Sequence, residues 1–143
     1  MIIVSGQRAR REEDLRSAID AMDRAFSAGN LDDFLAHFSE HAQLLLHEQE
    51  PVKGIDAIRD AFATVFDTLD TSAYRPSYEV MDAHDDHAYV LGSFHEVLRA
   101  RDGTSAIQVR GRVVQFWHRR QGSWRIVRLL TARSAPDEVQ NLA

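Results

Sequence analysis

The sequence predicts an α+β fold in a single domain. Three helical patterns occupy the first half of the chain, four long strand patterns occupy the second half, and short turns of the hairpin type separate these strands. Helices followed by hairpin-linked strands are typical of helices packed on an antiparallel sheet. The chain of 143 residues is long enough to bury a core without disulfides, and it contains no cysteine.

Apolar residues at helical spacing define the three expected helices. The first helix is predicted over residues 9–28, and its inward stripe consists of Leu15, Ile19, Met22 and Phe26. A short second helix is expected to start at Asn30, because Asp33 follows three residues later as in a capping box. The third helix is predicted over residues 55–69, with these apolar side chains turned inward: Ile55, Ile58, Phe62, Val65, Phe66 and Leu69.

Apolar segments bounded by turn residues define the expected strands. One strand is predicted over residues 42–48, and four more over residues 74–83, 87–100, 106–120 and 123–133. The dipeptides between these four tolerate positive φ, which is typical of tight hairpins: Asp85-Asp86, Asp102-Gly103 and Gln121-Gly122. The last four strands should therefore form an antiparallel meander.

The hairpin turns also predict a register, which sorts the side chains onto two faces. Pairing across the last turn places Gln115 opposite Arg128. Both fall on the face that is richer in large apolar groups, where we expect the helices to pack, together with Phe94, Glu96 and Trp117. The other face is not cleanly polar either. Its apolar residues predict a partner surface, most simply a second copy of the chain.

Composition argues against several classes of function. The formal net charge is −5, which does not suit general nucleic-acid binding. No apolar run reaches the ~18 residues that a membrane span needs, and the first arginines follow the short apolar start, the reverse of a secretory signal. We therefore expect a cytoplasmic protein without nucleic-acid or membrane partners. Its domain should span residues 9–135, with a flexible N-terminal end over residues 1–8 and a tail over residues 136–143.

Two segments resemble the nuclear-transport-factor-2-like superfamily, which includes SnoaL-like and ketosteroid-isomerase-like proteins. The segment Ala28–Phe38, followed by Ala42, Gly54 and Ile58, is similar to the opening motif of the superfamily. The segment Phe116–Ile126 closely resembles the last hairpin of the association domain of calcium/calmodulin-dependent kinase. This resemblance implies a cone of three N-terminal helices packed on a curved, mainly antiparallel mixed sheet. It also implies a pocket on the concave side and homodimers formed through the outer sheet face.

The catalytic residues of known relatives are largely missing. In an ungapped comparison, Leu46 replaces the general-base Asp of ketosteroid isomerase and Met22 replaces its oxyanion-stabilising Tyr, so we reject that chemistry. Limonene-epoxide hydrolases need an Asp-Arg-Asp group, and residues 105–133 contain no Asp or Glu. The paired histidines of scytalone dehydratase could correspond to His95 and His118, which the predicted register turns outward.

Arg128 and Glu48 are the candidate catalytic residues. Two pocket arginines of the kinase association domain correspond to Phe94 and Gln115, which leaves Arg128 as the inward arginine. Arg128 either fixes a carboxylate, carbonyl or enolate by two parallel hydrogen bonds or makes a structural pair. Glu48 shares the parity of Leu46, and it either serves as an acid or base in the pocket or ends the strand in a solvated loop.

The remaining site residues are predicted ligand contacts. They are Met22, Leu46, Tyr74, Phe94, Glu96, Gln115 and Trp117. Seven histidines occur, but none forms a His-Glu-x-x-His run, and the segment His84-Asp85-Asp86-His87 is typical of a soluble turn. We therefore expect neither a metal nor a cofactor.

We interpret the protein as a homodimer with a mostly apolar pocket for a small hydrophobic molecule. If it is an enzyme, the resemblance to SnoaL-like proteins implies isomerisation, cyclisation or dehydration of a hydrophobic or polyketide-like metabolite. The alternative is a non-catalytic module that binds a ligand or assembles through its sheet. A carboxylate or tyrosine hydroxyl beside Arg128 or Gln115 in an open cavity favours the enzyme, and a sealed, filled cone favours the module.

Overall fold

The computed structural model describes residues 2–134 and 137–138, with the side chains of residues 6–134. Its helices are α1 (Ile2–Ala28), α2 (Leu31–Leu35) and α3 (Ile55–Thr68). Its strands are β1 (Phe38–Leu45), β2 (Val52–Lys53), β3 (Leu69–His84), β4 (His87–Ala100), β5 (Ala106–Arg120), β6 (Ser123–Arg133) and β7 (Asp137–Glu138). The helices precede the long strands, which confirms the predicted α+β class.

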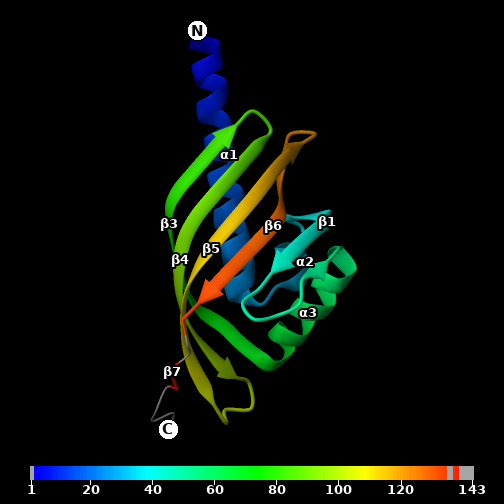
Figure 1. Ribbon diagram of the computed structural model, residues 1–143, viewed down its shortest axis with the longest axis vertical. Coiled ribbons are helices and arrows are strands. Elements are labelled where there is room, and N and C mark those ends of the chain that lie inside the picture. Colours follow the sequence, from blue (N-terminus) through cyan, green and yellow to red (C-terminus); the bar gives the residue numbers. More distant parts are fainter. Residues whose placement is uncertain (1, 135–136, 139–143) are drawn as a thin grey trace.

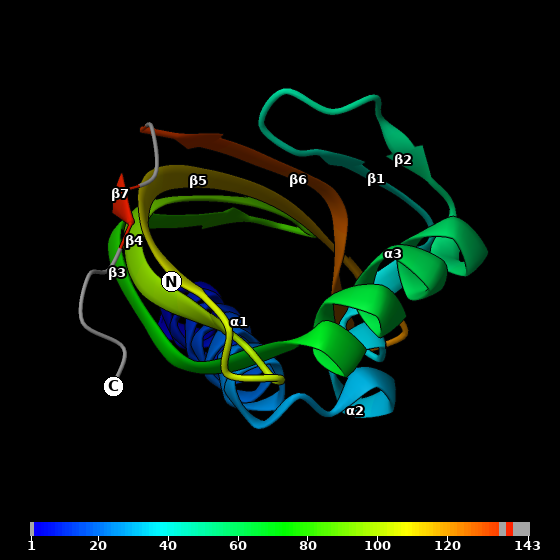
Figure 2. The ribbon, with the colours of Figure 1, turned by 90° about the horizontal axis from the view of Figure 1, so that it is seen from below.

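The strands form one mixed sheet that curves round the helices. The order is β2-β1-β6-β5-β4-β3; all neighbours are antiparallel except β1 and β6, and β7 pairs with β5 outside this path. The long strands lie side by side in front of α1 (Figure 1), and seen from below they bend into an arc that α1 and α3 close (Figure 2). The predicted cone of helices on a curved, mainly antiparallel mixed sheet is confirmed.

Some element ends differ from the predicted ones. The first helix starts at Ile2 rather than at residue 9, so most of the expected N-terminal end over residues 1–8 is helical. The first strand covers Phe38–Leu45 instead of residues 42–48, and β3 starts at Leu69 instead of residue 74. Part of the expected tail over residues 136–143 forms β7, whereas residues 136 and 139–143 lie outside the described residues.

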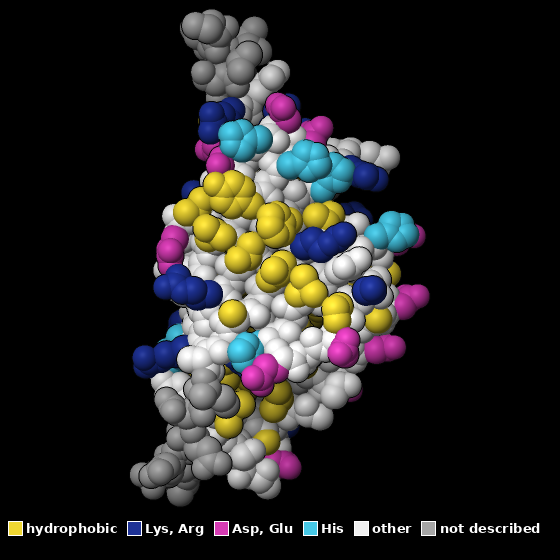
Figure 3. Space-filling model, in the orientation of Figure 1, with side chains coloured by type: hydrophobic (Ala, Val, Ile, Leu, Met, Phe, Trp, Pro, Cys, Tyr) yellow, Lys and Arg dark blue, Asp and Glu magenta, His cyan; other side chains and the backbone are white. Residues whose placement is uncertain are grey.

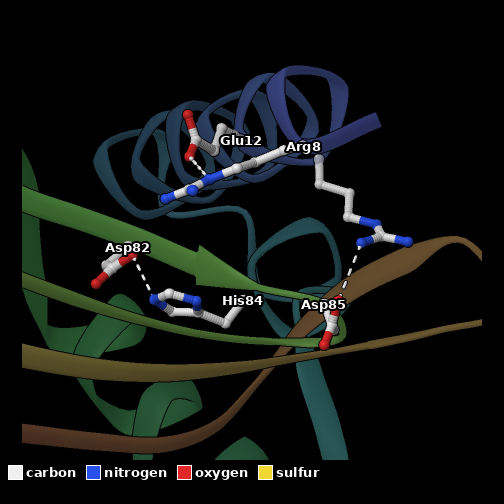
Figure 4. Close-up of polar contacts among 6 residues, drawn as sticks. Arg8, Glu12, Asp82, His84 and Asp85 are labelled. Carbon is white, nitrogen blue, oxygen red and sulfur yellow. Dashed lines mark hydrogen bonds and ion pairs between the residues drawn. The ribbon is translucent and has the colours of Figure 1, made fainter. Parts of the chain in front are cut away.

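Two ion pairs lie along the N-terminal part of α1. Arg8 and Glu12 lie one turn apart and form an ion pair of 3.3 Å on the helix surface (Figure 4). Arg11 reaches the β3–β4 turn, where its guanidinium lies 3.7 Å from Asp85. Residues 6–10 are all exposed, so this part of α1 carries no apolar period and the sequence pattern misses it. Among the residues that the structure describes, no helix is long and apolar enough to cross a membrane.

Other local predictions are confirmed. Leu15 and Ile19 on the first stripe are fully buried, and Met22 is 4% exposed. Asn30 caps α2, because its Oδ1 accepts a hydrogen bond of 3.1 Å from the backbone N–H of Asp33. The tight turns follow β3, β4 and β5 as predicted, and the whole β4–β5 register agrees with the predicted one.

A β-bulge in β6 changes which side chains of that strand face inward. Near the β5–β6 turn the pairs follow the predicted register, but Val127 is then one residue too many. Beyond it, Phe116 pairs with Arg128, and Gln115 pairs with Leu129. The predicted inward position of Arg128 is therefore wrong. Its side chain shares the outer face with Phe116, and its guanidinium donates to the Val127 carbonyl at 2.7 Å.

Candidate active site

The helices and the concave face of the sheet enclose a cavity of about 340 Å³. Its size lies in the usual range for small-molecule sites. Its wall is mainly apolar and includes Phe26, Phe34, Phe62, Phe94 and Leu129. Polar side chains in the cavity wall and behind it form two groups, one around Asp23 and one around Arg133.

The Asp23 group consists of Asp23 on α1, Tyr78 on β3, and Gln115 and Trp117 on β5, joined by directed hydrogen bonds. The Tyr78 hydroxyl donates to Asp23 Oδ2 at 2.7 Å. The Trp117 indole N–H donates to Gln115 Oε1 at 2.9 Å, which leaves the amide N–H of Gln115 to donate to the Tyr78 oxygen. The chain of donors therefore ends on Asp23, whose carboxylate is an acceptor beside the cavity.

Burial dominates the protonation behaviour of this group. It raises the pKa of Asp23 from 3.8 to about 6, although the hydrogen bond from Tyr78 acts in the opposite direction. Burial likewise raises the pKa of Tyr78 and Tyr74 above the ordinary value, so both hydroxyls keep their protons near neutral pH. A carboxylate with a pKa of about 6 can both accept and return a proton near pH 7.

Gly92 leaves space for the side chain of Tyr78. The two residues pair across β3 and β4. A Cβ on Gly92 would lie 2.6 Å from the carbonyl oxygen of Ser77 and 2.9 Å from Cδ1 of Tyr78. The missing side chain therefore makes room for the ring that reaches Asp23.

We expect Gly92→Ala to destabilise the protein by about 1–3 kcal/mol, because the neighbouring backbone must move. Urea denaturation measures this change. The control is Gly6→Ala on α1, where an added Cβ meets nothing within 4 Å and should be neutral or stabilising. Equal stability of the two variants would show that the backbone of β3 can move to accept the added Cβ without a loss in the free energy of unfolding.

The Arg133 group consists of His47, Glu96, Thr131 and Arg133, which all line the cavity. The backbone N–H of His47 donates to Thr131 Oγ1 at 3.3 Å, and the backbone N–H of Arg133 donates to His47 Nδ1 at 3.4 Å. Burial raises the pKa of Glu96 to about 7, against the lowering effect of the Arg133 charge. Within the described residues, Glu96 Oε2 is buried without a hydrogen-bond partner.

Six of the predicted ligand contacts lie in the cavity wall. They are Met22, Leu46, Tyr74, Phe94, Glu96 and Gln115. Trp117 is 1% exposed and lies in the core, so its predicted place in the wall is wrong. The indole N–H instead donates to Gln115 Oε1. The role of the six in binding stays a prediction.

Glu48 points away from the cavity. Its strand ends at Leu45, and Glu48 itself adopts a positive φ of 55°. The alternation that would have turned it inward therefore stops before it. The side chain is 84% exposed, with Oε1 3.7 Å from His47 Nε2. The predicted inward position of Glu48 is wrong, and His47 lines the cavity in its place.

The histidines of the long strands lie on the outer face, as the register predicts. His95 Nε2 lies 2.6 Å from the side-chain nitrogen of Gln108, and the ring of His118 stacks on His87 with centroids 4.5 Å apart. An inward histidine pair is therefore not formed. Among the described residues, no group of three or more His, Cys, Asp or Glu side chains is arranged to hold a metal ion.

Comparison with known proteins gives a family but few functional details. A family model for the SnoaL-like domain matches residues 19–129. No curated protein gives a significant match.

Solved structures agree in fold at low sequence identity. A ketosteroid isomerase-like protein from Erwinia carotovora atroseptica SCRI1043 is 16% identical, with a TM-score of 0.78, covering 87% of this chain and 96% of that chain. A candidate scytalone dehydratase from Novosphingobium aromaticivorans DSM 12444 is 11% identical, with a TM-score of 0.80 and coverages of 96% and 93%. A type 2 hexachlorocyclohexane dehydrochlorinase is 14% identical, with a TM-score of 0.70 and coverages of 88% and 89%. The chain belongs to the SnoaL-like domain family, within the nuclear-transport-factor-2-like superfamily.

Proposed function

We propose that the protein is a cofactor-independent enzyme that moves a proton on a hydrophobic small molecule bound in the cavity. One observation carries this proposal. The carboxylate of Asp23 lies beside a largely apolar cavity and accepts a hydrogen bond of 2.7 Å from Tyr78. A positioned carboxylate that is partly desolvated is suited to general acid–base catalysis.

In this mechanism Asp23 removes a proton from a carbon next to a carbonyl group. The C–H electron pair moves toward the carbonyl, and negative charge develops on its oxygen. Tyr74 shares the cavity, and the charges of Asp23 and Glu96 both act on its hydroxyl, which keeps its proton. The Tyr74 hydroxyl would stabilise the developing oxyanion, and Asp23 would return the proton elsewhere on the molecule.

The reaction class that fits is isomerisation, cyclisation or dehydration of a hydrophobic or polyketide-like metabolite. Each of these can begin with removal of a proton from carbon. The similar structures include proteins named as a dehydratase and a dehydrochlorinase, both of which are names of eliminations. The open cavity and the hydroxyl of Tyr78 beside Gln115 favour this proposal over a non-catalytic binding module.

Deuterium uptake by 2-tetralone in D₂O tests the proposal. This small ketone has acidic C–H groups next to its carbonyl, and NMR follows their exchange. We expect exchange that saturates with 2-tetralone and is inhibited by 2-naphthol, an enol mimic of the same size. Catalysis in the cavity would be contradicted if the exchange rate rises linearly with 2-tetralone concentration, is not inhibited by 2-naphthol and equals the rate with free acetate.

We also propose that the outer sheet face forms a homodimer. A row of aliphatic side chains crosses five strands there, each paired with the next: Val80, Leu91, Val114, Leu130 and Leu45. Tyr89 and Phe116 beside this row are 38% and 42% exposed. Hydrophobic side chains gather over the middle of this face (Figure 3). Such a row across the face is suited to a self-complementary contact around a twofold axis.

Leu91→Glu should convert the dimer into a monomer, because it places a charge in the centre of the row. Analytical ultracentrifugation measures the change in mass. Ser123→Glu is the control, since it adds the same charge at the exposed β5–β6 turn. A wild-type chain that sediments as a monomer, or a Leu91→Glu variant that stays dimeric, would contradict the proposed interface.

A further inference from the structure

The polar side chains of the Arg133 group offer hydrogen-bond donors to one part of the cavity wall. His47 Nδ1 accepts from the backbone N–H of Arg133, so the proton of a neutral His47 ring lies on Nε2. Thr131 Oγ1 accepts from the backbone of His47, which leaves the hydroxyl proton of Thr131 to donate elsewhere. The Arg133 guanidinium carries a fixed positive charge and only donates.

Glu96 adds a polar atom without a hydrogen-bond partner to the same part of the wall. Its Oε2 is buried and, among the described residues, has no hydrogen-bond partner. The raised pKa of Glu96 keeps a large fraction of this carboxyl in the acid form near neutral pH, where it is a donor. A buried polar atom without a partner is costly, and a bound ligand can supply the partner.

We infer that Glu96, Thr131 and Arg133 form a subsite for a carboxylate, so that the ligand is a hydrophobic molecule that carries one carboxylate group. This inference rests on the proposed function, because it assumes that a ligand enters the cavity. A carboxylate has two oxygens that only accept hydrogen bonds, and the three side chains can all donate. The single guanidinium matches its one negative charge and its planar shape.

The position of the subsite follows from the strand pairing. Arg133 pairs with Gly111, and Gly111 pairs with Phe94. Thr131 pairs with Val113 one row further toward the Asp23 group. A carboxylate on Arg133 would therefore leave the rest of the ligand against Phe94 and Val113, with its far end directed toward Asp23.

The β-bulge supplies a matched control on the same strand. Arg128 and Arg133 both belong to β6, but Arg128 shares the outer face with Phe116 whereas Arg133 lines the cavity. Removing either charge changes the net charge of the protein equally. Only Arg133 can act on a ligand inside the cone by direct contact.

Isothermal titration calorimetry at pH 6 with 2-naphthoate and 2-naphthamide tests the subsite. These probes have the same shape and differ in charge. We expect wild-type protein to bind 2-naphthoate about tenfold more tightly than 2-naphthamide or better. Arg133→Gln should reduce this preference to within about twofold, and Arg128→Gln should leave it unchanged. Arg133→Lys keeps the charge and should keep part of the preference.

Where Arg133→Gln folds, two results would overturn this inference alone. One is equal binding of the two probes by wild-type protein. The other is a preference for 2-naphthoate that survives in a folded Arg133→Gln variant, with folding checked by its thermal melt. If Arg133→Gln does not fold, loss of the preference in Arg128→Gln, or an undiminished preference in Arg133→Lys, overturns it. Failure of both probes to bind wild-type protein contradicts this inference and the proposed function together, whereas equal binding contradicts the carboxylate subsite alone.

Discussion

Raising the pH from about 4 to about 8 should destabilise the folded protein by several kcal/mol. Burial raises the pKa of Asp23 from 3.8 to about 6 and that of Glu96 from 4.5 to about 7. At a pH between the unfolded-state pKa and the folded-state pKa of each group, the folded protein holds a proton that the unfolded protein has released. The free energy of unfolding therefore falls as the pH rises. The stabilisation is complete below the unfolded-state pKa values and is lost as the pH passes through about 6 and 7. Each group contributes about 3 kcal/mol.

Urea denaturation at several pH values measures this effect. The double variant Asp23→Asn, Glu96→Gln has no titrating group at either position, so its stability should exceed that of the wild type at pH 8. The difference between the two proteins isolates the two buried carboxyls. The surface carboxylates Asp70 and Asp102 have lowered pKa values and act in the opposite direction, but both proteins contain them. Parallel stability curves for wild type and double variant would show that neither carboxyl is destabilised by burial.

The fold was predictable because its determinants are local. The stripe around Leu15 and Ile19 has a helical period, and the tight turns have residues that accept positive φ. The β4–β5 register follows from one turn and continues without interruption along both strands. These features act over a few residues, so the sequence alone displays them.

The β5–β6 pairing was predictable only near its turn. A bulge at Val127 leaves the alternating pattern of the strand intact in sequence but exchanges its faces beyond that point. This single residue turns Arg128 outward and brings Leu129, Thr131 and Arg133 to the cavity. The predicted register therefore placed Arg128 in the cavity, whereas the structure has Arg133 there.

The sequence does contain a signal for Asp23. It follows Ile19 by four residues and precedes Phe26 by three, so it falls within the apolar stripe of α1. A carboxylate in such a stripe must be buried or face a cavity. Its partner Tyr78 could not be predicted, because contact between β3 and α1 depends on the curvature of the whole sheet. The inward position predicted for Glu48 was wrong for a different reason. The predicted strand continued to residue 48, whereas β1 ends at Leu45.

Asp23→Asn should lower the exchange of 2-tetralone by about 10²–10⁴-fold, the usual contribution of a general base. The amide has the shape of the carboxylate and still accepts from Tyr78, but it cannot take a proton near neutral pH. The wild-type rate, corrected for background exchange, should rise as the pH passes through about 6, because only the ionised form of Asp23 is a base. Initial rates in D₂O, measured by NMR across this range, check both statements.

Asp20→Asn is the matched control for this variant. Asp20 lies one turn earlier on α1 and is exposed, and its charge raises the pKa of Asp23. Its removal should lower the midpoint of the pH profile slightly and leave the plateau rate unchanged. If Asp23→Asn retains wild-type exchange, the base lies elsewhere in the cavity, and the proposed role of Asp23 is wrong.

Stability separates a catalytic role of Asp23 from a structural one. A residue that only supports the fold loses activity when it is replaced because the protein becomes less stable. For Asp23, the raised pKa means that the ionised carboxylate is itself destabilising at pH 8. Replacing it should therefore increase stability while it decreases activity. The Asp23→Asn variant should therefore unfold at a higher urea concentration than the wild type while exchanging 2-tetralone far more slowly. A joint loss of stability and exchange would identify Asp23 as a packing residue that holds Tyr78 in place.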